Sequence, residues 1–392
     1  QEAKAAYAVL LGTEHEKYLR ALHALGLTQM GRGNLDGAEA SMGEAKAIYA
    51  RLLGTNSSSY LAAVRILGQI EVCRGNVDAA EVLLRDVKKG YATVHGDRDP
   101  DYLNTVYTLG HIEWKRGDLS AAEALLQDVK VRYAEVLGLR HPEYLNTIYT
   151  LGQILIDRDC LNESEALLQD LKSIQAEVLG VTHLDYLATV FTLAQIQWRR
   201  GNLDAENLLQ EAKAGFAERL GIRHPDYLAT VYTLGNVQWK RGSLDKADAS
   251  LREVKTLQAD VLGIRHLHYL DTVFSLGQIQ LSRGNLDNAD ALVQEAKAGY
   301  LEVIGVRHSD FIDTQFTQAQ ILWKRGKLDE AKAIMLDVRN AYADVLGTNH
   351  SKYLSTLDSL GRMEMDSGNL DAAEALLQEV KDAASDTRHP DY

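Results

Sequence analysis

The sequence predicts an all-α protein, a right-handed superhelical solenoid of about nine 42-residue helix-turn-helix repeats. Aromatic residues recur at a fixed spacing, each repeat contains two stretches of helical periodicity, and a glycine recurs at one place in every repeat. Because such hairpins pack only on their neighbours, a chain of 392 residues need not divide into two or three globular domains.

The aromatic residues set the period. They follow one another at 42 residues, with one interval of 41, in the series Tyr18, Tyr60, Tyr102, Tyr144, Tyr186, Tyr227, Tyr269, Phe311 and Tyr353. The short interval falls where Asp204 runs directly into Ala205-Glu206, one alanine fewer than in the last repeat. We therefore expect a partial repeat at 1–17 with a second helix only, repeats at 18–59, 60–101, 102–143, 144–185, 186–226, 227–268, 269–310 and 311–352, and a shortened last repeat at 353–392.

The third repeat illustrates the two helices. The first helix is expected from about Tyr102 to Lys115, with a buried side made of Leu103, Val106, Leu109, Gly110 and Ile112. The second helix carries an apolar stripe at helical spacing, which predicts burial of Ala122, Leu126, Val129, Tyr133 and Val136. No segment alternates with a period of two, so no sheet is expected.

The connections between helices carry recurrent residues. Each second helix ends near a glycine, Gly138 in the third repeat, which is suited to a left-handed C-cap. A small residue in mid-helix, such as Gly110, lets the two helices of a repeat approach closely. In the fourth repeat Asp159 replaces the turn glycine, which predicts higher mobility there or an altered angle between repeats.

Prolines and histidines mark the start of the first helices. All four prolines stand there, where a missing N–H is tolerated: Pro100, Pro142, Pro225 and Pro390. Eight histidines lie in the loops between repeats and are expected to cap the first helices: His15, His141, His183, His224, His266, His308, His350 and His389. Loops one repeat apart cannot bring their nitrogens to the ~2.0–2.1 Å that a metal requires, so no metal site is expected.

These motifs resemble a known family. The segment Leu220-Gly221-Ile222-Arg223-His224-Pro225-Asp226, a helix with Leu-Gly at its middle, and turns such as Arg200-Gly201-Asn202-Leu203-Asp204 resemble the 42-residue tetratricopeptide repeats of kinesin light chains. Similar repeats form the sensor arrays of many NOD-like receptors. The resemblance covers the whole chain and implies a generic binding scaffold. Kinesin light chains carry paired asparagines for cargo, whereas the matching positions here are mostly of the type Thr150 and Gln153.

By the same resemblance, the first helices line the concave face of the array. One column of side chains recurs on them at i, i+4 and i+7, and combines aromatic rings, amides and a cation after each tryptophan. Such a column suits an extended peptide, whose acidic groups the cations would meet. The predicted peptide- or protein-binding residues are Tyr107, His111, Trp114, Lys115, Tyr149, Gln153, Phe191, Gln195, Trp198, Arg199, Tyr232, Asn236, Trp239, Lys240, Phe274, Gln278, Phe316, Gln320, Trp323 and Lys324.

An alternative reading of this column remains open. A residue that recurs in every repeat also serves every interface between repeats, so the rings can be packing and the amides can bond neighbouring repeats. Positions that vary between repeats are better candidates for recognition, because packing does not fix them. They are Asn104, Asn146, Asp271 and Asp313 early in the first helices, and Lys115, Asp157, Arg199, Lys240, Ser282 and Lys324 at their ends.

Composition narrows the partners. The chain has 42 basic and 55 acidic residues, a net charge of −13, and no long basic run, which argues against nucleic acid. No segment approaches the ~20 apolar residues of a membrane span. Cys73 and Cys160 lie two repeats apart, too far for a disulfide, and are expected as free thiols of a cytoplasmic protein. No signal peptide is visible, although the chain begins at Gln1 rather than Met.

Binding is the predicted role. No nucleophile stands beside a base and no isolated carboxylate pair breaks the repeat, so we expect neither an enzyme nor a cofactor. The leading hypothesis is a scaffold that holds a peptide or protein partner in the concave groove. The alternative is a structural subunit that braces a larger assembly or stacks end to end through uncapped terminal repeats into a filament.

Overall fold

A computed structural model describes residues 2–386 as nineteen α-helices, with no strand in that range. Their bounds are α1 Glu2–Leu11, α2 Glu16–Gly31, α3 Leu35–Leu53, α4 Ser58–Arg74, α5 Val77–Val94, α6 Pro100–Arg116, α7 Leu119–Val136, α8 Pro142–Asp157, α9 Leu161–Val178, α10 Leu184–Arg199, α11 Ala205–Leu220, α12 Pro225–Lys240, α13 Leu244–Val261, α14 Leu267–Ser282, α15 Leu286–Val303, α16 Ser309–Lys324, α17 Leu328–Leu346, α18 Ser351–Asp366 and α19 Leu370–Asp386. The predicted all-α class is confirmed.

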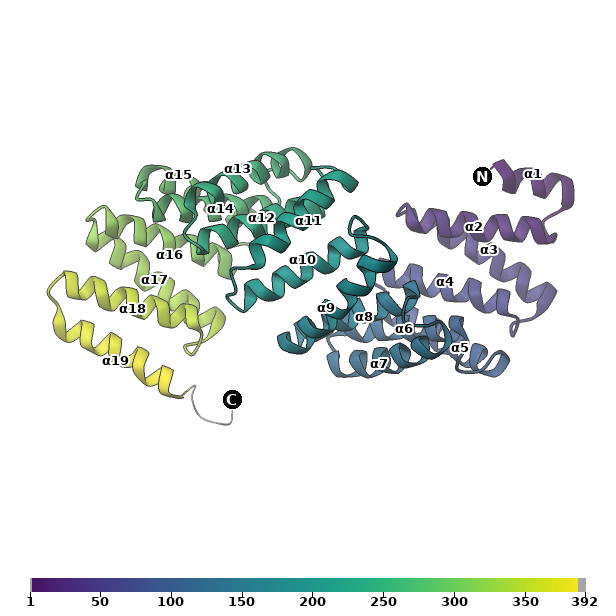
Figure 1. The fold of residues 1–392 in the computed structure, drawn as a ribbon. Helices are drawn as coiled ribbons and strands as arrows, with labels where there is room; N and C mark the ends of the chain where they lie inside the picture. The colour runs from purple at the N-terminus through teal and green to yellow at the C-terminus, as the bar shows by residue number, and fades with distance from the viewer. Residues whose placement is uncertain (1, 387–392) are drawn as a thin grey trace. The chain divides into compact units, whose positions relative to one another are not determined.

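The helices group into two compact units, unit 1 (Gln1–Thr189) and unit 2 (Val190–Tyr392). Within each unit, successive helices pack side by side as antiparallel hairpins, as Figure 1 shows for α4 and α5 or α14 and α15. The even-numbered helices are the first helices of the hairpins, and they also touch one another, α4 with α6 in unit 1 and α12 with α14 in unit 2. Each unit therefore presents a face built from first helices alone.

Helix α6 shows how local sequence sets the ends of a first helix. The Asp99 carboxylate accepts hydrogen bonds from the backbone N–H groups of Asp101 and Tyr102, at 2.9 and 3.2 Å, and Pro100 follows this N-cap. The helix ends at Gly117, whose φ of 85° and ψ of 3° are left-handed. The helix is thus slightly longer than predicted at both ends, because its caps lie outside the apolar stripe.

The glycines after the second helices differ from the prediction. Gly138 has the expected positive φ of 87°, but the helix there is capped by Leu137 in a right-handed conformation. Where such a glycine is itself the cap, as at Gly221, its ψ of 161° lies far from the left-handed helical value. The prediction of a left-handed C-cap at this position was wrong. This extended, positive-φ region is essentially restricted to glycine, which explains the recurrence equally well.

The histidine caps agree with the prediction, and the irregular turn at Asp159 keeps the positive φ of the glycine that it replaces. In the loop before α8, His141 Nδ1 accepts from the N–H of Glu143 at 3.3 Å, and the same bond is made by His15, His183, His224, His266, His308 and His350. Asp159 has a φ of 61° and is the only non-glycine residue with a positive φ in the described part of the chain. His389, Pro390 and the end of the predicted last repeat lie outside the described residues.

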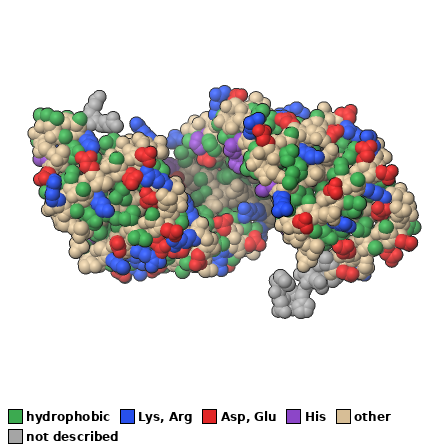
Figure 2. Space-filling model, turned by 180° about the vertical axis from the view of Figure 1, so that it is seen from behind, with side chains coloured by type: hydrophobic (Ala, Val, Ile, Leu, Met, Phe, Trp, Pro, Cys, Tyr) green, Lys and Arg blue, Asp and Glu red, His purple; other side chains and the backbone are tan. Residues whose placement is uncertain are grey.

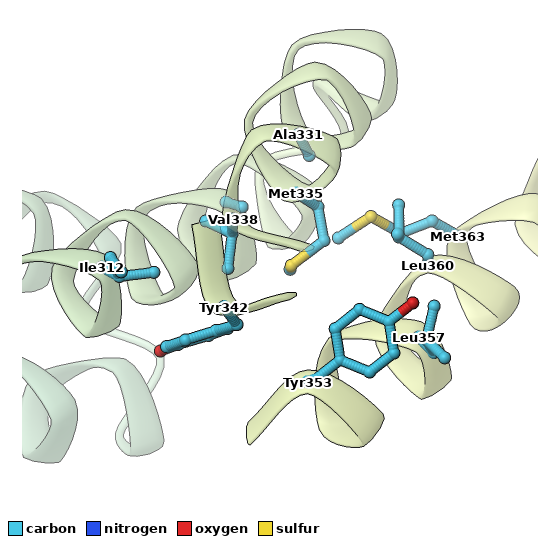
Figure 3. Close-up of a cluster of buried hydrophobic side chains, with 10 residues drawn as sticks. Ile312, Ala331, Met335, Val338, Tyr342, Tyr353, Leu357, Leu360 and Met363 are labelled. Atoms are coloured by element: carbon cyan, nitrogen blue, oxygen red, sulfur yellow. The ribbon is translucent and has the colours of Figure 1, made fainter. Parts of the chain in front are cut away.

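The core is made of clusters of buried side chains, several of which join adjacent hairpins. Figure 3 shows one cluster in unit 2, where Met335 and Val338 of α17 lie between Ile312 of α16 and Leu357 of α18. In α7, Ala122, Leu126, Val129 and Tyr133 are buried as predicted, but Val136, the last residue of the helix, is 39% exposed. Each fully buried leucine stabilises the fold by about 1.5–3 kcal/mol.

The aromatic residues that set the period connect successive hairpins. Tyr269 donates a hydrogen bond at 2.6 Å to Glu295 on the second helix of its own hairpin. The same carboxylate accepts at 3.0 Å from Lys255 on the preceding hairpin, and the Lys255 ammonium lies 5.6 Å from the Tyr269 ring. Equivalent trios are Lys4, Tyr18, Glu44 and Lys213, Tyr227, Glu253. The period is fixed by the interface between repeats.

Candidate functional site

The aromatic members of the predicted binding column are half-buried and pack into the hydrophobic core. Tyr107 and Trp114 lie against the cluster around Leu126, and Phe191 and Trp198 lie against the cluster around Leu209. Phe274 packs on the cluster containing Tyr300, and Phe316 and Trp323 pack on the one in Figure 3. Each ring therefore stabilises its hairpin and leaves only part of its surface for a ligand.

The tryptophan indoles bond to the next repeat. Trp114 Nε1 donates to Asp157 at 2.7 Å, and Trp323 Nε1 donates to Asp366 at 2.7 Å. Trp239 Nε1 donates to the Ser282 hydroxyl at 3.3 Å. Donor and acceptor are 43 residues apart each time, one more than the period, so the pairing was readable in the sequence as a Trp followed by an acceptor 43 positions later. These acceptors include two positions singled out for variation, Asp157 and Ser282.

Two of the cations that follow the tryptophans bond to the preceding repeat. Lys115 Nζ donates to the Val72 carbonyl at 3.2 Å and Lys324 Nζ to the Leu281 carbonyl at 3.5 Å, each on the preceding first helix. These carbonyls lie in last turns, where a cation also complements the helix dipole. Lys240 stands 5.2 Å from the ring of Trp239, and Arg199 is exposed.

Hydroxyls and a histidine complete the column. The Tyr107 hydroxyl lies 2.9 Å from Thr150 Oγ1 and 3.2 Å from His111 Nε2, and Tyr232 lies 3.5 Å from the Ser275 hydroxyl. The His111 ring is 5.1 Å from the Tyr107 ring and 5.3 Å from that of Trp114. Burial, and then the charge of Lys115, lower the pKa of His111. His111 is therefore a neutral member of this stack at pH 7.

The amides follow the same face and are half-buried. They are Gln153, Gln195, Asn236, Gln278 and Gln320, and Tyr149 beside Gln153 is half-buried as well. In unit 2, Gln195 and Gln278 line two separate hollows among the first helices. The first hollow has a volume of about 590 Å³ and also contains Phe191, Tyr232 and Asp271. The second, of about 430 Å³, contains Lys240, Asp313, Phe316 and Lys352.

One residue of this face was missed by the sequence reasoning. The aromatic position of the second repeat is occupied by Arg65, whose side chain is only 15% exposed. Its guanidinium donates to Asn104 at 3.4 Å and Asp101 at 3.3 Å, and its buried Nε has no partner among the described residues. The signal that identifies it is a residue other than Tyr or Phe at this position, as also occurs at His23 and Asp358 in the first and last repeats.

Two general features of the described residues bear on chemistry. They contain no group of three or more His, Cys, Asp or Glu placed to hold a metal ion, and none of their helices has the length and apolar character needed to cross a membrane. Cys73 and Cys160 are free, as predicted. On the face shown in Figure 2, basic and acidic side chains are interspersed.

Sequence comparison decides the family of this array. Models of the tetratricopeptide repeat match residues 19–59, 103–143 and 310–386. The chain is a tetratricopeptide repeat array. No curated protein sequence matches this tetratricopeptide array.

Solved structures share its fold. The quorum sensor NprR from B. thuringiensis matches at 13% identity over 94% of this tetratricopeptide chain and 99% of its own, with a TM-score of 0.68. A Rap protein complexed with Competence and Sporulation Factor matches at 11% identity over 95% and 99%, with a TM-score of 0.60. A kinesin light chain with tetratricopeptide-like repeats from Podospora anserina matches at 24% identity over 52% and 96%, with a TM-score of 0.44.

Proposed function

We propose that this tetratricopeptide array is a scaffold that binds a peptide or protein partner on the face formed by its first helices, in the cytoplasm. The observation that carries the proposal is the pair of hollows in unit 2, of about 590 and 430 Å³. Both open on the same face, and each spans first helices of successive repeats. An extended segment crossing the repeats meets both of them.

The amide column supports this mode of binding. Gln195 and Gln278 line the two hollows, and Asn236 stands between them in the column. An amide side chain offers both a donor and an acceptor, so a row of amides satisfies a peptide backbone at regular intervals. The Rap protein, which shares the fold, is complexed with Competence and Sporulation Factor, a precedent for ligand binding by such an array.

The test is a selection of random 16-residue peptides displayed on phage, with the whole chain as bait. Affinities of the selected peptides are then measured for the wild type and for the triple variant Gln195→Ala/Asn236→Ala/Gln278→Ala. We expect affinity to fall by about tenfold or more, because about 0.5–1.5 kcal/mol is lost for each hydrogen bond removed.

The matched control carries three exposed amides of second helices, Gln127→Ala/Gln169→Ala/Gln294→Ala, and is expected to bind as the wild type does. Circular dichroism melts of both triple variants establish that they fold. Equal affinity for wild type and the first-helix variant, or failure to select any peptide, contradicts the proposed mode.

A further inference from the structure

The larger hollow of unit 2 has a chemical character of its own. It lies among α10, α12 and α14, and its walls include the rings of Phe191 and Tyr232 and the carboxylates of Asp226 and Asp271. Among the described residues that line it, none is a lysine or an arginine. The hollow thus combines apolar and aromatic walls with two carboxylates and two histidines, His266 and His268.

Two positions that line this hollow carry smaller side chains than the same positions of the next two repeats. Ala229 occupies the place that Asp271 and Asp313 take in the next two repeats, and Gln258 occupies the place of Tyr300 and Tyr342. Gln258 accepts a hydrogen bond at 2.7 Å from Thr272, so its side chain is held against α14. Two repeats on, Asp313 and Tyr342 at these places line the smaller hollow of about 430 Å³, and the shorter side chains Ala229 and Gln258 accompany the larger volume of about 590 Å³ here.

The following repeat shows what a satisfied carboxylate looks like at this position. Asp313 accepts a hydrogen bond from the Tyr342 hydroxyl and another, at 2.7 Å, from the Lys352 ammonium. Lys352 comes from the next first helix, and its side chain is 37% exposed. The negative charge of Asp313 is therefore neutralised within the chain.

Asp271 has the same tyrosine but lacks the lysine. It accepts from the Tyr300 hydroxyl at 2.6 Å, and its other oxygen lies 3.7 Å from His268 Nδ1. The residue 42 positions before Lys352 is Asp310, a second carboxylate. Burial, followed by the charge of Asp310, raises the pKa of Asp271. A partly buried carboxylate beside another one is stabilised by any cation that reaches it.

We propose that this hollow binds a basic side chain, lysine or arginine, of the protein partner, with Asp271 as the carboxylate that pairs with its cationic group. Tyr232 and Phe191 line the hollow, and aromatic rings pack well on an aliphatic stem and attract ammonium and guanidinium groups. The volume of about 590 Å³ accommodates such a side chain with its neighbouring backbone. This inference rests on the proposed function and specifies that the partner segment bound by unit 2 carries a positive charge.

The probe for the test is N-acetyl-arginine N-methylamide, compared with its citrulline counterpart, which has the same shape without the charge. Saturation-transfer NMR titrations are made on the whole chain. We expect the arginine probe to bind about fivefold or more tightly than the citrulline probe, which corresponds to about 1 kcal/mol for the ion pair.

Three variants locate the site. Asp271→Asn keeps an acceptor for Tyr300 and is expected to abolish the preference for arginine. Asp310→Lys supplies an internal cation, as Lys352 does for Asp313, and is expected to weaken arginine binding to the same degree. Asp344→Asn, at an exposed carboxylate of the second helix α17 that lines neither hollow, is the matched control and leaves the preference unchanged.

The inference is overturned if the two probes bind alike, if neither binds, or if Asp271→Asn retains the preference. Thermal melts confirm that each variant is folded. If the selected peptides nevertheless require Gln195, Asn236 and Gln278, the proposed scaffold function is supported and only the basic-residue pocket is rejected. Conversely, the arginine preference can depend on Asp271 while the phage selection yields no peptide. That result supports the pocket and rejects peptide binding along the amide column.

Discussion

Two equivalent positions of the repeat carry different polar pairs in the two units, Asn104 with Tyr133 in unit 1 and Asp271 with Tyr300 in unit 2. In unit 1 the fifth residue after the N-cap Asp99 is Asn104, whose amide oxygen accepts from Arg65 and Gln69. The second-helix tyrosine of that repeat, Tyr133, is buried with a hydroxyl that has no partner among the described residues. In unit 2 the equivalent residues, Asp271 and Tyr300, are hydrogen-bonded at 2.6 Å.

This difference shows what the repeat leaves free. The apolar positions are nearly identical in the two units, since Leu126 and Leu251 are both 0% exposed. The polar residues above them form different pairs on the same backbone. Packing therefore fixes the scaffold, while the polar column sets the charge that each unit offers to a partner.

The largest expected effect is a loss of stability on truncating a core leucine, and we expect the same loss in both units. Leu126→Ala and Leu251→Ala each remove a fully buried side chain that packs over a glycine, Gly110 or Gly235. We expect each to lower the free energy of unfolding by about 2–5 kcal/mol. Urea unfolding followed by circular dichroism measures it, and a cost confined to one unit would show that the cores are not equivalent.

The second prediction addresses the tyrosines. Tyr300→Phe deletes a hydrogen bond to a carboxylate and is expected to cost about 1.5–3 kcal/mol. Tyr133→Phe deletes a buried hydroxyl without a partner and is expected to be neutral or stabilising. The same urea titrations compare the two. Equal costs would mean that Tyr133 is bonded in solution and that the units do not differ here.

The turns give a third comparison. Asp159 has a φ of 61° where Gly117 has a φ of 85°. Asp159→Gly is expected to stabilise unit 1 by about 1 kcal/mol, and Gly117→Asp to destabilise it by a similar amount, because a side chain disfavours positive φ. Amide hydrogen exchange at the two turns is a second readout. Exchange no faster at Asp159 than at Gly117 would count against strain at this position.

The smallest expected effect is a dependence on pH in unit 1. The folded-state pKa of His111 is lowered by burial and then by Lys115, so the unfolded chain binds a proton more readily than the folded chain does. Stability is then complete above the ordinary pKa of about 6.5 and falls as the pH drops below it. His111→Gln is expected to reduce this loss by less than about 1 kcal/mol. Melting temperatures of variant and wild type at pH 7.5 and 5.5 reveal it. Parallel losses in both proteins would contradict it.

Much of the fold was predictable because it depends on local signals. Helical periodicity gave both ends of α6 within two residues, and the loop histidines of the described repeats were assigned correctly as caps. Predictions failed at Val136, which is partly exposed at the end of α7, and at Gly221, whose ψ lies far from the left-handed helical value. Neither outcome is encoded within a single helix.

The residues of the candidate binding face were predictable from the sequence, but the contacts that each side chain makes were not. The sequence identified the column containing Trp114, Gln195 and Tyr232, but it left open whether each side chain faces a ligand or a neighbouring repeat. The structure pairs the Trp114 indole with Asp157, and it places Gln195 and Tyr232 at the wall of a hollow. Binding by these residues stays a prediction.

By itself, the sequence determined the all-α class, the 42-residue period and the residues that each hairpin buries, because periodicity and caps act over a few residues. Only the tertiary structure decided which polar groups meet. Asp313 finds Lys352 while Asp271 faces Asp310, although all four stand in register along the chain. Such pairs depend on how adjacent hairpins pack. The packing decides whether a carboxylate is already paired within the chain, as Asp313 is, or lacks a lysine partner, as Asp271 does.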